Sequence, residues 1–173
     1  MALSGSINLG VDMKLTGTSG LAADLDSLTN ANLALALTLT DGSGANQAQT
    51  MWHDRRTLAA GASEDLDLAG GLTNGLGETI TFTNVRALII KNNDTVNTTL
   101  GVGNASTNAV STIFGNVSDL IVVRPEGVFA LYCGNDTNPY AITAGSADIL
   151  QIARGLGSPS DTTYDIIIIG TTS

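Results

Sequence analysis

The amino-acid sequence predicts an all-β fold, a jelly-roll-like two-sheet antiparallel sandwich that carries an N-terminal β extension. Apolar and polar residues alternate over many short segments, and these segments end at clusters of Gly, Asn, Asp and Ser that are typical of turns. About eight such segments follow residue 57, as a jelly roll requires. We therefore divide the chain into an extension with two strands, residues 1–57, and a sandwich domain, residues 58–173.

The extension contains two alternating segments. Residues 6–15 place Ile7, Leu9 and three further apolar residues on one face, and residues 33–40 alternate leucine with alanine or threonine. Both patterns predict strands with one apolar face. Between them, leucines recur at near-helical spacing over residues 21–28, which indicates either one or two helical turns or an ordered loop.

Two hairpins are predicted in the second half of the chain. The turn sequence Arg-Pro-Glu-Gly at residues 124–127 separates the strands 119–123 and 128–133. A turn at residues 144–146 likewise separates strands at 140–143 and 148–152. Further strands are predicted at residues 63–68, 79–83, 85–91 and 98–103.

The last strand, residues 164–170, holds four consecutive isoleucines followed by Gly170. This apolar run is too short to span a membrane, and its β-branched residues disfavour a helix. We expect a strand that is buried on both faces and pairs with earlier segments on each side, so that the fold closes through contacts distant in sequence.

Composition excludes several classes of protein. The chain has 173 residues, of which 43% are hydrophobic and 13% charged, so it is not intrinsically disordered. Seven basic and sixteen acidic residues give a net charge of −9, which opposes binding to nucleic acid. The N-terminus lacks the pattern of a signal peptide, so we expect no Sec export. The one cysteine, Cys133, lies in an apolar run, and we expect it to be buried.

Large and charged side chains gather at residues 51–56. Adjacent residues of a strand point to opposite faces, so the neighbours His53 and Asp54 do not form a catalytic pair, and no nucleophile motif accompanies them. Trp and Arg are residue types that anchor interfaces. We therefore predict a partner interface at Trp52, Arg55 and Arg56, with a plain structural strand as the alternative.

No catalytic, cofactor or metal site is predicted. One histidine and one cysteine far apart in the sequence cannot supply a zinc site within the chain. The loops at residues 92–94 and 135–137 have too few ligands for an EF-hand and are better explained as turns.

Several stretches resemble structural proteins of tailed double-stranded DNA bacteriophages. They are residues 45–48 through Trp52, 54–60, 64–70, 124–127, 141–148 and 164–171. The resemblance spans most of the chain from Ser4 onward. It implies a non-enzymatic virion component, a decoration or cement protein on the outer surface of the capsid, with the major capsid protein as partner. It implies no cofactor, nucleic acid or membrane.

The physical pattern agrees with that use. A cement protein adds contact area between capsid subunits, and acidic charge suits the outside of a DNA-filled head. We expect a homotrimer in which residues 1–57 act as an arm that reaches a neighbour or the shell. The alternative is a carbohydrate-binding adhesin of a tail or head fibre, which would expose Trp52 with Tyr140 or Tyr164 in one groove.

Overall fold

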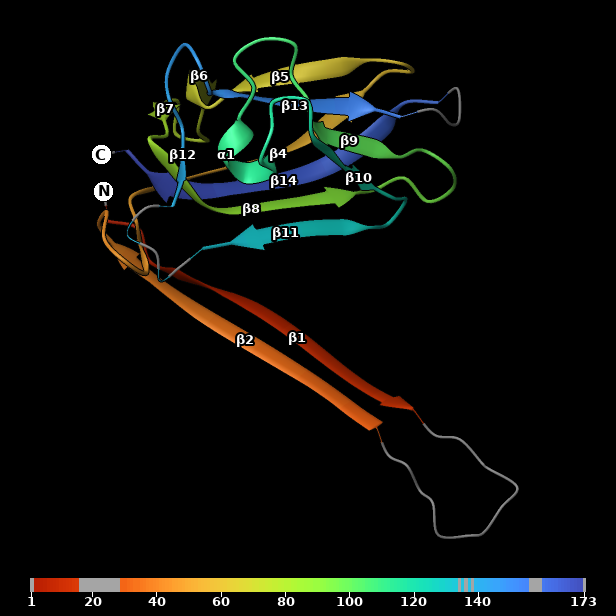
Figure 1. The fold of residues 1–173 in the computed structure, drawn as a ribbon, viewed down its shortest axis with the longest axis horizontal. Helices are drawn as coiled ribbons and strands as arrows, with labels where there is room; N and C mark the ends of the chain where they lie inside the picture. Colours follow the sequence, from red (N-terminus) through yellow and green to blue (C-terminus); the bar gives the residue numbers. More distant parts are fainter. Residues whose placement is uncertain are drawn as a thin grey trace, which may run out of the picture.

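The computed structural model describes residues 2–15, 29–133, 135, 137, 139–155 and 160–172, with the backbone alone for 11–15 and 29–35. It shows a β-sandwich from which a long two-stranded hairpin projects (Figure 1). The helical turns or loop predicted at residues 21–28 lie outside the described residues.

The sandwich consists of two antiparallel sheets, of five and four strands, that pack face to face (Figure 1). The first, which we name the β14 sheet, has the order β11 (Val128–Tyr132), β8 (Asn84–Asn92), β14 (Thr162–Thr171) and β4 (Thr50–Leu58), and the short β12 (Tyr140–Ala141) also pairs with β8. The second, the β13 sheet, has the order β10 (Leu120–Val123), β9 (Leu100–Gly103), β13 (Ile149–Arg154) and β5 (Ser63–Asp67).

The order of the eight strands other than β12 confirms the predicted jelly roll. Counted along the chain, the first, eighth, third and sixth strands form the β14 sheet, and the second, seventh, fourth and fifth form the β13 sheet. This is the strand order of a jelly roll, which consists of two Greek keys. Smaller elements complete the body, namely a ribbon of β6 (Ala69–Thr73) and β7 (Thr79–Thr81) and one helical turn, α1 (Ser111–Phe114).

The strands of the two hairpins predicted in the second half exist but do not pair with one another as predicted. Among the described residues, only the antiparallel pair Thr143–Ala147 closes the second turn. β10 pairs with β9, whereas β11 pairs with β8 in the opposite sheet. The turn at residues 124–127 therefore crosses between the sheets, and Gly127 N–H donates to the Arg124 carbonyl within it. Likewise β12 joins the β14 sheet, while β13 pairs with β5 and β9. Turn chemistry predicts where the chain reverses but not which sheet receives the next strand.

Asp94 organises the loop that connects β8 to β9. Its carboxylate accepts hydrogen bonds from the backbone N–H groups of Val96, Asn97 and Thr98. These bonds, above all the one from Val96, lower the pKa of Asp94 to about 2. The loop at residues 92–94 is thus a turn, as predicted.

The isoleucine strand β14 lies in the centre of its sheet, as predicted, between β4 and β8. Only one of its faces is buried, however. Tyr164, Ile166 and Ile168 point into the core between the sheets, where they join Leu88 and the rest of the apolar cluster. Ile167, on the other face, is 36% exposed, so the prediction that both faces are buried is wrong for this chain by itself.

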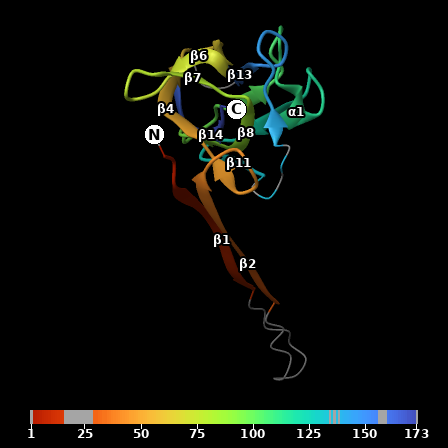
Figure 2. The ribbon, with the colours of Figure 1, turned by 90° about the vertical axis from the view of Figure 1, so that its left-hand side faces the viewer.

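The N-terminal extension forms the arm, which we define as the hairpin of β1 (Gly5–Leu15) and β2 (Thr29–Asp41). Eleven residue pairs join the two strands, from Gly5 opposite Leu39 to Leu15 opposite Thr29. Beyond its own pairing, β2 pairs only with the two-residue β3 (Gln47–Ala48) among the described strands. The arm hangs away from the sandwich in both views (Figures 1 and 2).

The predicted domain boundary after residue 57 falls inside β4. Because β4 pairs with β14 from Thr50 to Leu58, the sandwich begins at Thr50, and only the arm and its base stand apart.

Candidate interaction surfaces

Trp52, the first residue of the predicted interface, is not available to a partner. It lies on the inner face of β4, is only 4% exposed, and donates its indole Nε1–H to the Thr73 carbonyl at 3.1 Å. Its predicted role as an exposed anchor is therefore wrong. A large apolar side chain in the centre of a strand gains more by filling its own core than by facing water.

Arg56 also serves the interior of the molecule. Its Nε donates to Glu64 Oε2 at 2.9 Å, and the other carboxylate oxygen accepts the Tyr164 hydroxyl at 2.6 Å. This network links β4, β5 and β14 and so holds the two sheets together along one edge. The hydrogen bond with Glu64 raises the pKa of Arg56, and burial raises that of Tyr164.

Arg55 alone of the predicted trio faces outward from the β14 sheet. Its guanidinium forms a two-pronged ion pair with Asp165 on the neighbouring strand, with Nε–Oδ1 at 2.6 Å and Nη2–Oδ2 at 2.9 Å. This pairing lowers the pKa of Asp165 to about 2. The pair marks one border of a surface on the solvent side of the sheet.

We name this solvent side the outer face. The strand register brings three rows of residues together across β4, β14, β8 and β11. One row is charged and the other two are mainly apolar: Arg55, Asp165, Lys91 and Val128; His53, Ile167, Ile89 and Ala130; Met51, Ile169, Ala87 and Tyr132.

The apolar rows of the outer face are only partly covered. Ile167 and Met51 are 36% and 40% exposed, and Ile89 and Ile169 are half-buried. Val128, which ends the charged row on the edge strand β11, is 59% exposed. Large contiguous apolar patches on a protein surface mark interaction sites, whereas scattered single residues do not.

The arm is attached to the body through a β-bulge. β8 pairs with β14 so that Ala87 lies opposite Ile169 and Val85 opposite Gly170, which leaves Arg86 as the extra residue. The fully buried Arg86 side chain donates from Nη2 to the carbonyls of Ser43 and Gly44, at 3.1 and 2.6 Å.

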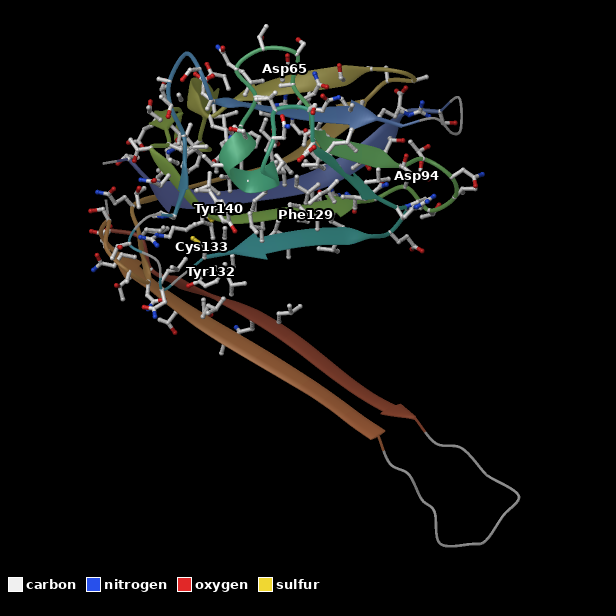
Figure 3. All side chains as sticks on the ribbon, viewed as in Figure 1. Asp65, Asp94, Phe129, Tyr132, Cys133 and Tyr140 are labelled. Atoms are coloured by element: carbon white, nitrogen blue, oxygen red, sulfur yellow. The ribbon has the colours of Figure 1, made fainter. Side chains whose placement is uncertain are left out.

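A second set of contacts supports the same attachment. Arg86 Nη1 also donates to the Cys133 carbonyl at 3.3 Å, and Tyr132 Oη lies 3.5 Å from Asn46 Oδ1. Figure 3 shows Tyr132 and Cys133 at the end of β11, beside the start of the arm. Cys133 itself is half-buried, so the prediction that it is buried is only partly correct.

Where its side chains are described, the arm presents apolar residues to solvent. Ile7 lies opposite Leu37 in the register, and both are half-buried, while Leu9 is 48% exposed. The register continues with Val11 opposite Leu33. A two-stranded hairpin without further packing is marginally stable in water. The arm by itself is therefore only marginally stable, and further packing on its apolar face would stabilise it.

A third surface lies along one edge of the sandwich, at the edge strand β10 of the β13 sheet. Three consecutive residues there, Leu120, Ile121 and Val122, are exposed. Exposed apolar edge strands are sites of strand pairing with other chains. Because β10 continues through the crossing turn into Val128 of β11, both sheets present an open edge on this side.

A groove of about 420 Å³ runs beside the free edge of β4. Its lining includes Leu3, Met51, Leu76 and Glu78. Leu76 is exposed and Met51 belongs also to the outer face, so the groove extends the apolar surface around the sheet edge.

The described residues contain no group of three or more His, Cys, Asp and Glu that could hold a metal ion. His53 and Asp54 lie on opposite faces of β4, as strand alternation predicts, and Asp54 accepts hydrogen bonds from Arg55 N–H and Arg56 Nη1. Among the described helices, none has the length and apolarity to cross a membrane.

The outer face and the β10 edge were missed by the sequence-based prediction of an interface. Their apolar residues have the pattern of ordinary core positions, because the alternation of apolar and polar residues cannot distinguish a buried face of a strand from an exposed one. The isoleucine run carried the one usable signal, since four β-branched residues in succession fit a strand covered on both sides.

No protein-family model matches the chain, and no curated protein matches it significantly.

Proposed function

We propose that this chain is a non-enzymatic structural protein of a tailed-phage particle, a decoration protein that binds the outer surface of the capsid and bridges its subunits. The observation that carries the proposal is the arm, a long apolar hairpin fixed to a jelly-roll body and projecting away from it. Such an element serves attachment to a neighbouring subunit. The major capsid protein is the proposed partner, and a homotrimer the proposed assembly.

The surface chemistry supports a binding protein that adds contact area. Apolar residues are exposed on the outer face and on β10, where a partner could bury them or pair with the free strand edge. The net charge of −9 favours a position outside a DNA-filled head, because packaged DNA would repel an acidic protein.

The carbohydrate-binding alternative receives less support from the aromatic residues. Sugar sites stack aromatic rings against the ligand. Trp52 and Tyr164 are buried in the core, and Tyr140 is half-buried. None of the three can form the exposed groove that this alternative requires.

Removal of the arm tests the proposal. A chain that lacks residues 1–40 keeps β3, β4 and the contacts of Arg86 with Ser43 and Gly44, so we expect a folded sandwich. We expect this chain to lose binding to capsids that lack the protein, measured by cosedimentation. Undiminished binding of the truncated chain would show that the arm is not the attachment element.

A point substitution examines the β10 edge in the same assay. Val122→Asp places a charge in the exposed edge strand, and Val96→Asp places the same charge in an exposed loop as a matched control. If the β10 edge contacts the shell, only Val122→Asp weakens cosedimentation. Equal binding of the two variants would exclude β10 from the contact.

A further inference from the structure

We propose that the outer face of the β14 sheet is the binding site for the arm of a second copy of this chain. Two incomplete apolar β surfaces coexist in one molecule. The outer face leaves Met51 and Ile167 exposed, and the arm leaves Leu9 exposed. Each surface could cover the other, because the face of a β-sheet is commonly covered by a second layer of β-strands about 10 Å away.

The composition of β14 supports a covered outer face. Ile166 and Ile168 fill the core, whereas Ile167 and Ile169 point to the outer side and remain partly open. A strand with one solvated face alternates apolar with polar residues, but an unbroken isoleucine run is typical of a strand covered on both sides. Within the described part of one chain, the β13 sheet covers the inner face of β14, and no second layer covers the exposed Ile167 on its outer face.

The arm of the same chain does not provide the missing layer. Its base is held at the end of β8 by Arg86, and from there both strands run away from the sheet (Figures 1 and 2). The base of the arm therefore meets only one end of the sheet, near Arg86 and the fully buried Ala87, and beyond that end the arm and the outer face diverge within one copy. An arm from a neighbouring copy can reach a face that is open in this way.

The dimensions of the two surfaces agree. The arm has eleven paired residues in each strand, which corresponds to a length of about 37 Å, and β14 has ten residues, which corresponds to about 34 Å. A ribbon of two strands is about 10 Å wide, so each arm placed on a neighbouring face buries roughly 750 Å² in total. Three such junctions in a closed homotrimer bury roughly 2,200 Å², which is enough for a stable assembly.

Charge favours this mode of contact between like copies. The whole chain carries a net charge of −9, so two bodies repel each other. The strands of the arm contain one acidic and one basic residue, Asp12 and Lys14, besides Asp41 at the base. A nearly neutral ribbon can thus approach an apolar face that is bordered by the internally neutralised pair Arg55–Asp165.

Paired substitutions in the full chain test this assignment. Leu9→Asp alters only the arm, Ile167→Asp alters only the outer face, and Val96→Asp is a control at a loop position that is more exposed than either. The measurement is the mass in solution by light scattering after size exclusion, with circular dichroism to verify that each variant folds. We expect the wild type and Val96→Asp to be oligomers and the other two variants to be monomers.

Mixing the two monomeric variants distinguishes arm-on-face contact from other symmetric contacts. The Leu9→Asp chain keeps an intact outer face, and the Ile167→Asp chain keeps an intact arm, so together they can form one complete junction. We expect a tagged Ile167→Asp chain to capture the Leu9→Asp chain but not untagged copies of itself. A monomeric wild type, an oligomer that survives the folded Ile167→Asp variant, or a mixture without capture would each overturn the inference. None of these results depends on binding to a capsid.

Discussion

Replacement of Arg86 by methionine should destabilise the body and release the base of the arm. Arg86 is fully buried and donates to three backbone carbonyls, those of Ser43, Gly44 and Cys133. Methionine occupies a similar length without a donor. Each carbonyl that loses its donor costs about 1–3 kcal/mol, and relief of burying the guanidinium charge offsets part of this.

We expect a net loss of about 3 kcal/mol in the free energy of unfolding, which lowers the midpoint of thermal unfolding by about 6–12 °C for a chain of this size. Scanning calorimetry measures this change. Proteinase K should also cleave residues 41–48 faster in the variant, because the segment is no longer held against the bulge of β8.

Arg124→Met is the matched control, because Arg124 is exposed in the crossing turn. The control should unfold within about 0.5 kcal/mol of the wild type. If Arg86→Met is as stable as the control and its residues 41–48 resist cleavage equally, then Arg86 does not hold the base of the arm in place.

Three further predictions concern the sandwich. Tyr164→Phe should lose about 1–2 kcal/mol in urea unfolding, because the buried hydroxyl no longer donates to Glu64; an unchanged midpoint would contradict the role of this network. Gly170→Ala should lose about 3 kcal/mol, since the new methyl group would clash with the Asn84 carbonyl oxygen, whereas Gly75→Ala meets nothing within 4 Å and should be neutral. Because the folded-state pKa of Asp94, about 2, is below its unfolded value, its contribution to stability is complete above about pH 4 and is lost as the pH falls toward 2. Acid titration of the wild type should therefore lose more stability over this interval than Asp94→Asn, and equal losses would refute the assignment.

Much of the fold was predictable from local patterns. The alternation in residues 6–15 and 33–40 predicted the two strands of the arm, and the isoleucine run predicted the central strand of a sheet. The count of strands and turns predicted a sandwich, and the jelly-roll order confirms it. These features depend on side-chain periodicity, which is local in the sequence.

The sheet assignment of β10 to β13 was not predictable in this way. The turn at residues 124–127 has the chemistry of a hairpin, yet it connects the two sheets. β10 pairs with β9 in one sheet, and β11 pairs with β8 in the other. Such pairing is decided by contacts between segments distant in sequence, to which turn propensity does not respond.

The predicted interface at Trp52, Arg55 and Arg56 stays a prediction, but the structure shows which way its three side chains point. Trp52 and Arg56 lie on the inner side of β4, and only Arg55 faces outward. Trp52, Asp54 and Arg56 share a face because they follow one another at intervals of two residues, but periodicity does not state which face is turned to solvent. The exposed isoleucine Ile167 became recognisable only in the three-dimensional structure.

The most direct test of the proposed function is whether purified tailed-phage particles contain this protein, and in how many copies. Quantitative mass spectrometry against the major capsid protein supplies the ratio. A decoration protein that bridges capsid subunits predicts a ratio near parity. A few copies per particle would instead indicate a tail or fibre component, and absence from particles would contradict a structural role in the virion.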